Sequence, residues 1–159
     1  MAKKEASTNV IRLLAGANVA HEVREYDPEA VDGQAVAQEL GEDPDAVFKS
    51  LVAENENHEH FIFEVPVDQE LDLKKAAKAT GSKWIKLIPQ KELLPLTGYV
   101  HGGCSPIGLK KRMPCYMDET AFLFDKIFIS AGRRGMQVGL APNDLKTFVQ
   151  AKVVDLLLL

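Results

Sequence analysis

The sequence predicts one mixed α/β domain over residues 1–159, on three observations. Residues 10–17 and 73–80 carry apolar side chains at helical spacing, with capping residues or a glycine at their ends. Two pairs of strand-like segments flank polar or glycine-containing turns: 50–54 with 60–65, and 126–130 with 136–140. With 159 residues, 46% of them hydrophobic, the chain is long enough to bury one core.

The helices are predicted from capping residues and apolar spacing. Residues 7–9 offer N-caps for the helix at 10–17, and Gly81 closes the basic amphipathic helix at 73–80. Pro142 opens a last helix through residue 149. Two shorter helices are expected at 35–40, before Gly41, and at 43–48, with Pro44 in the first turn.

The strands are predicted from apolar runs that end at turn residues. Residues 21–26 alternate apolar and polar side chains, and Asp27-Pro28 ends that strand. Residues 50–54 and 60–65 pair as a hairpin across the polar turn at 55–58. A second hairpin joins 126–130 to 136–140 across 131–135, and residues 153–154 add a short strand.

Composition excludes several classes of protein. The apolar and charged fractions, 46% and 26%, are those of a globular chain rather than a disordered or collagen-like one. The longest apolar run, 156–159, is far shorter than the roughly 20 residues of a membrane helix, and the polar residues 7–9 predict no signal peptide. Cys104 and Cys115 form neither a CxxC pair nor a metal quartet. We therefore expect a reduced, cytoplasmic protein with no membrane partner, no metal and no cofactor.

Charge is distributed unevenly along the chain. Residues 20–70 are strongly acidic and residues 71–112 strongly basic, although the formal net charge is only -4. A local positive face attracts a polyanion more than the total charge repels it. The alternative is that these charges simply keep helices and loops solvated.

The segment with the most unusual composition is 97–108, which contains four glycines and one proline. Gly102 and Gly103 allow a ligand to approach the main chain, where amides can bind an oxyanion or phosphate. The alternative is a loop that needs glycine only for positive φ. The segment fits neither GxGxxG nor GxxxxGK[ST], so we expect no nucleotide-cofactor domain.

Cationic and nucleophilic side chains supply further candidates. Lys49 lies between apolar residues, where it either snorkels to the surface or presents a cation to a phosphate or ribose. The turn at 130–135 carries two arginines beside small residues, an arrangement that suits phosphate recognition or simple solubility. Cys104, with His101 three residues earlier, is a possible nucleophile, although a buried free cysteine is more common.

Together these segments resemble the YbaK/EbsC family, the free-standing relatives of the editing domain of bacterial prolyl-tRNA synthetases. The resemblance spans nearly the whole chain and rests on four ordered motifs: 48–51, 71–78, 97–112 and 130–135. It implies a curved, partly barrel-like mixed sheet surrounded by helices. It also implies an aminoacyl-tRNA deacylase, an ester hydrolase or a lyase-type enzyme, that removes a mischarged amino acid from tRNA.

The resemblance also implies roles for individual residues. Lys49 would contact the terminal adenosine, and the amides of Gly102 and Gly103 would hold the ester carbonyl. The substrate-binding residues carried over are Tyr26, Ser50, Ser105, Ser130 and Gly132. The residues expected to meet the acceptor stem are Lys110, Lys111, Arg112, Arg133 and Arg134.

The favoured substrate is Cys-tRNA(Pro), whose own thiol would attack the ester. The partners implied are mischarged tRNA(Pro), possibly tRNA(Cys), and prolyl-tRNA synthetase, but not DNA. The chain departs from the family pattern at four positions: Asp32, Cys104, Ala131 and Gln137. Two alternatives therefore stay open, namely clearance of alanine or another small residue by water, and a tRNA- or synthetase-binding module without turnover.

Overall fold

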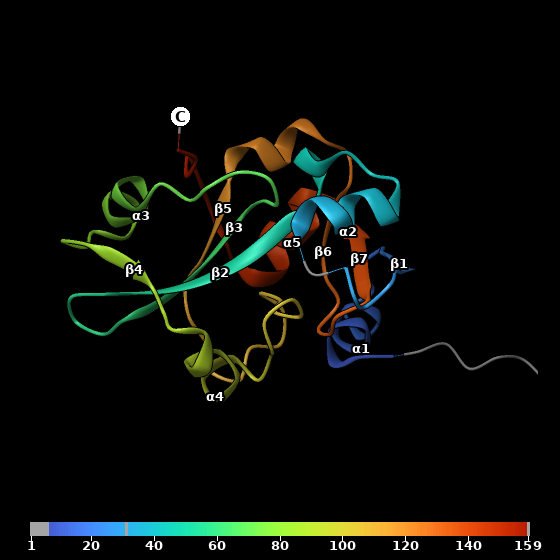
Figure 1. Cartoon of the computed structure of the whole chain (residues 1–159), viewed down its shortest axis with the longest axis horizontal. Coiled ribbons are helices and arrows are strands. Elements are labelled where there is room, and N and C mark those ends of the chain that lie inside the picture. Colours follow the sequence, from blue (N-terminus) through green and yellow to red (C-terminus); the bar gives the residue numbers. More distant parts are fainter. Residues whose placement is uncertain (1–6, 31, 159) are drawn as a thin grey trace, which may run out of the picture.

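Two β-sheets and five α-helices make up residues 7–30 and 32–158, the part of the chain that the computed structural model describes (Figure 1). The larger sheet has the strand order β4 (Ile85–Leu87), β2 (Phe48–Asn55), β3 (His60–Pro66), β5 (Cys115–Asp118), β8 (Lys152–Val154). The smaller sheet has the order β1 (Glu22–Glu25), β7 (Met136–Leu140), β6 (Ile127–Ser130). The mixed α/β class predicted from the sequence is confirmed. The N-terminal residues considered for a signal peptide include 1–6, which lie outside the described residues.

Both predicted hairpins are present, and their registers determine which side chains face each other. β2 and β3 are antiparallel, with Ser50 opposite Glu64. β6 and β7 are also antiparallel, with Ser130 opposite Gln137. β5 pairs in parallel with both β3 and β8, so the larger sheet is mixed.

The two sheets meet at one point rather than closing into a barrel. A parallel bridge joins Val47, just before β2, to Phe128 in β6. Within the described residues the strands form two open sheets, which replace the single partly barrel-like sheet that the resemblance implied. The junction brings the start of β2 close to the end of β6, where the candidate site lies.

The helices begin and end where capping chemistry places them. The Thr8 side chain accepts a hydrogen bond from the Ile11 amide at the start of α1 (Asn9–Gly16). Left-handed glycines at 41 and 81 end α2 (Gly33–Leu40) and α3 (Leu73–Thr80). The remaining helices are α4 (Leu93–Thr97) and α5 (Pro142–Val149). No helix among the described residues has the length and apolar character needed to cross a bilayer.

Four elements differ from the sequence prediction. The helix expected at 43–48 is a single 3-10 turn, Pro44–Ala46, because Phe48 already pairs with Pro66 in the sheet. β4 and α4 were not predicted, because segments of three and five residues are too short for an apolar period to be recognised. β5 was also missed: all four of its residues are buried, so it shows no alternation.

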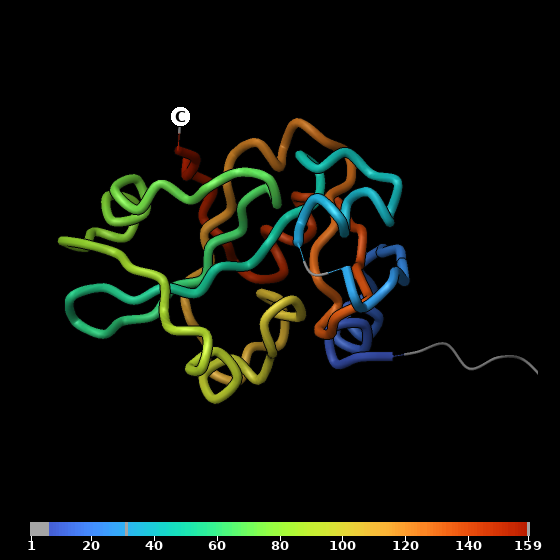
Figure 2. Tube along the Cα trace, viewed as in Figure 1, coloured from blue at the N-terminus to red at the C-terminus, as the bar shows by residue number. Residues whose placement is uncertain are grey.

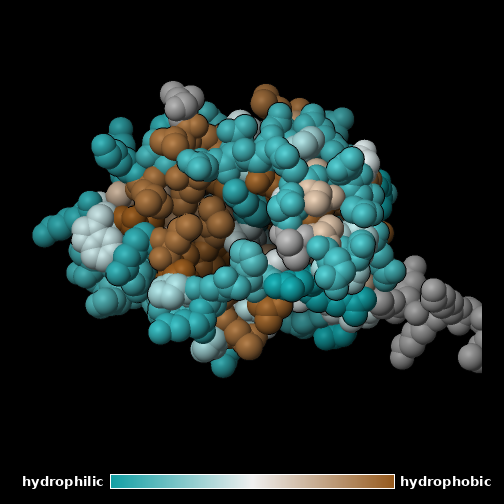
Figure 3. Space-filling model, viewed as in Figure 1, coloured by the Kyte–Doolittle hydropathy of each residue, from teal (hydrophilic) through white to brown (hydrophobic). Residues whose placement is uncertain are grey.

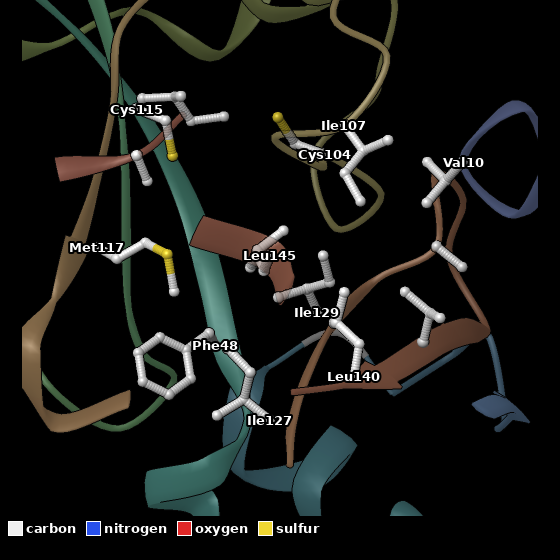
Figure 4. Close-up of a cluster of buried hydrophobic side chains, with 14 of the residues drawn as sticks. Val10, Phe48, Cys104, Ile107, Cys115, Met117, Ile127, Ile129, Leu140 and Leu145 are labelled. Carbon is white, nitrogen blue, oxygen red and sulfur yellow. The ribbon is translucent and has the colours of Figure 1, made fainter. Parts of the chain in front are cut away.

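The largest apolar cluster fills the space between the sheets, α1 and α5 (Figure 4). It includes Phe48, Met117, Ile129 and Leu145, each at most 2% exposed. A second cluster packs α3 against the larger sheet, and apolar side chains gather on that side of the molecule in Figure 3. Burial on this scale keeps the strand ends that line the candidate site in place.

Candidate functional site

A cavity of about 390 Å³ opens where the two sheets meet. That volume falls in the range of small-ligand sites, about 300 to 1,000 Å³. Its walls come from the start of β2, the end of β6, β7, α2 and the loop at 101–104. The cavity brings together six residues that the sequence had proposed: Tyr26, Lys49, Ser50, Gly102, Ser130 and Arg134.

Lys49 supplies a cation to this cavity. It is the second residue of β2, and its half-buried Nζ donates a hydrogen bond to the Val67 carbonyl at 3.3 Å. Burial lowers the pKa of Lys49, while the carboxylates of Glu70 and Asp68 oppose that shift. An ammonium group has three donors, and within the described chain this one uses a single donor. The other two are available to an anionic or carbonyl ligand.

Ser50 lines the cavity and is held from behind by Glu64. The Ser50 hydroxyl and Oε1 of Glu64 are hydrogen-bonded at 2.8 Å across the β2–β3 pair. Glu64 is fully buried, and burial raises its pKa well above the usual range; a hydrogen bond donated by Ser50 to the ionised carboxylate partly opposes this shift. Burial therefore favours the protonated form of this carboxyl group at the back of the cavity wall.

The glycine-rich loop is fixed against the turn at 131–135, which is distant in sequence (Figure 2). A Cβ on Gly103 would lie 2.9 Å from the Cα of Arg133, so only glycine permits this approach. The Arg134 Nε donates to the His101 carbonyl at 2.9 Å. Gly102 has φ +87°, a left-handed conformation that favours glycine. Glycine is therefore needed in this loop for two reasons: Gly102 adopts a positive φ, and Gly103 packs closely against the backbone of Arg133.

The main-chain amides of this loop are not equally available. The Gly103 amide donates to the Val100 carbonyl at 2.9 Å and is already used within the loop. The amides of Gly102 and Cys104 have no protein acceptor within residues 7–30 and 32–158. Both of these residues line the cavity. They are therefore the better candidates to bind a carbonyl oxygen or oxyanion.

Gln137 faces the same cavity from β7 and was noted in the sequence only as a departure from the family pattern. It is 5% exposed, and its Oε1 has no hydrogen-bond partner among the described residues. On β6 opposite, the Ser130 hydroxyl accepts the Gly132 amide at 3.2 Å. A buried acceptor without a protein donor suits a ligand that brings its own N–H or O–H.

Three of the predicted catalytic and substrate-binding residues do not line the cavity. Ser105 is fully buried, and its Oγ accepts the Ile107 amide at 3.2 Å. Gly132 packs against Val10 and Tyr99, and Gly103 packs against Arg133. Each supports the loop or the turn from outside the cavity.

The predicted tRNA-binding side chains lie outside the cavity, apart from Arg134 at its edge. Lys110, Lys111 and Arg112 are exposed on the continuation of the glycine-rich loop. Lys111 Nζ lies 3.4 Å from Nδ1 of His60, and Arg133 is exposed with Glu25 at 4.0 Å. The loop and turn that border the cavity thus also carry the exposed cations.

Cys104 lines the cavity, but its thiol does not have the character of a nucleophile. Burial raises its pKa to about 12, Glu64 adds to the rise and a Thr97 hydrogen bond opposes it, so the thiol is neutral at pH 7. Cys104 and Cys115 lie among aliphatic side chains (Figure 4), while His101 is exposed. The possible Cys104–His101 pair is therefore replaced by a buried free cysteine. No group of His, Cys, Asp or Glu in the described part of the chain is arranged to hold a metal ion.

Glu64 was not singled out from the sequence. The available signal was a glutamate within the apolar run 61–65, where a charged side chain facing the interior is unusual. Its partner across the hairpin, Ser50, follows from the register.

Comparisons with known proteins agree with this geometry. The family described as the aminoacyl-tRNA editing domain matches residues 27–148. EbsC of Enterococcus faecalis, a candidate Cys-tRNA(Pro)/Cys-tRNA(Cys) deacylase, is 37% identical over 98% of both chains. A proline–tRNA ligase of Shouchella clausii is 29% identical over 68% of this chain, which covers 19% of that ligase.

The fold is shared with a solved relative. The crystal structure of a candidate trans-editing enzyme for prolyl-tRNA synthetase superposes with a TM-score of 0.84 at 25% identity, covering 97% of this chain and 99% of that one. The family match extends from just after β1 into α5 and includes the β2 and β6 residues that line the cavity. The chain therefore belongs to the aminoacyl-tRNA editing domain family.

Proposed function

We propose that this protein is a trans-editing deacylase that removes cysteine from Cys-tRNA(Pro). The observation that carries the proposal is the cavity itself, which is lined by Lys49, Ser50, Ser130, Gly102 and Cys104 and so offers an ammonium, two hydroxyls and two main-chain amides. These groups can bind an ester and stabilise charge on its carbonyl oxygen. The name of the relative EbsC supports cysteine as the amino acid.

In the proposed reaction the substrate supplies the nucleophile. The thiol of the esterified cysteine attacks its own carbonyl carbon, a C–S bond forms, and the ester C–O bond breaks. The thiol proton passes to the ribose oxygen, which leaves as a hydroxyl, and cysteine departs as a thiolactone. The protein's part is to position the ester, with Lys49 on the terminal adenosine and the free loop amides on the carbonyl oxygen. This scheme needs no nucleophile from the neutral Cys104.

The tRNA itself would be held by the exposed cations bordering the cavity. The side chains proposed to contact phosphates are Lys110, Lys111, Arg112, Arg133 and Arg134. Such contacts release counterions, so binding should weaken steeply as salt rises. Prolyl-tRNA synthetase is the proposed partner, because a solved relative is described as a trans-editing enzyme for it.

The test is release of labelled amino acid from Cys-tRNA(Pro), Ser-tRNA(Pro) and Ala-tRNA(Pro). Serine is nearly isosteric with cysteine but is a far weaker nucleophile, so it isolates the contribution of the thiol. We expect fast loss of cysteine alone, reduced at least about tenfold by Lys49→Ala, in line with the loss of a charged hydrogen bond. The matched control is Lys146→Ala, which removes an exposed lysine of α5 outside the cavity lining.

A second candidate is hydrolysis of another small residue, such as alanine, by water. It is favoured by the amide oxygen of Gln137, which has no partner among residues 7–30 and 32–158 and could hold a water or an α-amino group. Loss of alanine or serine at the rate of cysteine would establish this candidate and overturn the thiol mechanism. Binding of tRNA without release of any amino acid would favour a module that binds without turnover.

A further inference from the structure

Glu64 and Asp118 are both fully buried carboxyl groups, but their hydrogen bonding differs. The two oxygens of Asp118 accept hydrogen bonds from Thr120 and from the Leu156 amide, which accounts for that residue structurally. Glu64 has a partner for Oε1 alone, the Ser50 hydroxyl at 2.8 Å. Its Oε2 is buried and has no partner among the described residues. Packing therefore does not account for an acid at position 64.

Glu64 is fully buried and its Oε2 has no partner among the described residues, which favours the protonated form of the acid. A protonated Glu64 carries one hydrogen that needs an acceptor. The other titratable groups beside it are the thiols of Cys104 and Cys115, which burial also keeps neutral. Oε2 has no acceptor within reach, whereas Oε1 lies at hydrogen-bond distance from Ser50 Oγ. A carboxylic acid is a stronger donor than a serine hydroxyl. The hydrogen between the two residues is therefore best assigned to Glu64.

This assignment changes what Ser50 presents to a ligand. A serine hydroxyl has one hydrogen and two lone pairs. If one lone pair accepts from Glu64, the serine hydrogen is not used there, and Ser50 has no other side-chain hydrogen bond within the described chain. Ser50 lines the cavity, so its hydrogen can reach an acceptor on a bound ligand.

We propose that Glu64 is a positioning residue that donates to Ser50 from behind the cavity wall and so directs the Ser50 hydrogen toward an oxygen of the bound aminoacyl ester. The inference rests on the proposed deacylase function. It assigns Ser50 the role of a donor and gives the buried acid a role in ligand binding.

Two substitutions separate this role from simple packing. Glu64→Gln keeps a donor, because its amide nitrogen can take the place of the acid oxygen, whereas Glu64→Met keeps the length without a donor. We expect Glu64→Gln to keep kcat/KM within about threefold. Glu64→Met should lose about tenfold, the range of one hydrogen bond, and should lose nothing more in a Ser50→Ala background. The proposal is overturned if the Glu64→Met and Ser50→Ala losses multiply, or if Glu64→Gln is as impaired as Glu64→Met.

A second measurement needs no substrate and so separates this proposal from the deacylase function. The infrared spectrum of the wild type at neutral pH should contain the C=O stretch of a neutral carboxylic acid. That band should vanish in Glu64→Gln and shift in Ser50→Ala, which removes the acceptor. A missing band, or one that Ser50→Ala leaves in place, overturns the Glu64–Ser50 arrangement. If the band behaves as expected while no charged tRNA is cleaved, the arrangement stands and the deacylase proposal falls.

Discussion

Substitution of Gly103 by alanine tests the contact that holds the glycine-rich loop against the turn at 131–135. An added Cβ would lie 2.9, 3.2 and 3.3 Å from the Cα, C and N atoms of Arg133. All three neighbours are backbone atoms, so no side chain can rotate away and the loop or the turn must move. Overpacking of this kind costs about 1 to 3 kcal/mol.

For a chain of this length, 1 kcal/mol corresponds to a change in Tm of about 2 to 4 °C. Gly103→Ala should therefore lower Tm by about 2 to 12 °C in thermal unfolding followed by circular dichroism. It should also lower kcat/KM for deacylation, because the loop that moves carries the free amides of Gly102 and Cys104. The matched control is Gly16→Ala in α1, where a Cβ meets nothing within 4 Å. That change should leave Tm unchanged or raise it slightly. Equal stability of Gly103→Ala and the wild type would refute the close approach of loop and turn.

Three further outcomes are expected. As pH rises above about 4.5, the unfolded chain loses the Glu64 proton while the folded chain keeps it. The free energy of unfolding of the wild type should therefore fall relative to that of Glu64→Gln, by up to about 1.4 kcal/mol per pH unit, until Glu64 also ionises in the folded state. Urea unfolding at several pH values measures this difference. Because burial raises the pKa of Cys104 to about 12, its alkylation at about pH 8 should be slow in the folded protein and fast in urea. Arg133→Ala should reduce the slope of log Kd for tRNA against log salt by about 1, while Lys146→Ala should not change it.

Each of these outcomes can fail in a specific way. Parallel stability curves for the wild type and Glu64→Gln would mean that Glu64 has no raised pKa in the folded state. Rapid alkylation of Cys104 in the folded protein would contradict its burial in the cavity wall. An unchanged salt slope for Arg133→Ala would place the tRNA phosphates away from the turn at 131–135.

Local signals in the amino-acid sequence are enough to predict several elements of this fold. The caps at Thr8 and Gly81, the two hairpins and the last helix were predicted because capping, turn chemistry and apolar spacing act over a few residues. The resemblance to the YbaK/EbsC family also rests on short motifs that follow one another in order along the chain. Lys49 and Gly102 were identified from such motifs, and both line the cavity.

Contacts between distant segments account for what the sequence did not predict. β5 is parallel to strands on both sides and fully buried, so it gives no alternating pattern that a sequence could show. Gly103 and Ser105 are next to residues that line the cavity, but they do not line it themselves. Gly103 packs against Arg133 and Ser105 accepts a hydrogen bond from the Ile107 amide, because the conformation of the loop determines which residues face the cavity. The sequence showed Glu64 only as a glutamate within the apolar run 61–65. Its role follows from the β2–β3 register, which places it behind Ser50, and from burial that leaves one of its oxygens without a partner among the described residues. Pairing register and desolvation are properties of the assembled fold, and no local run of residues encodes them.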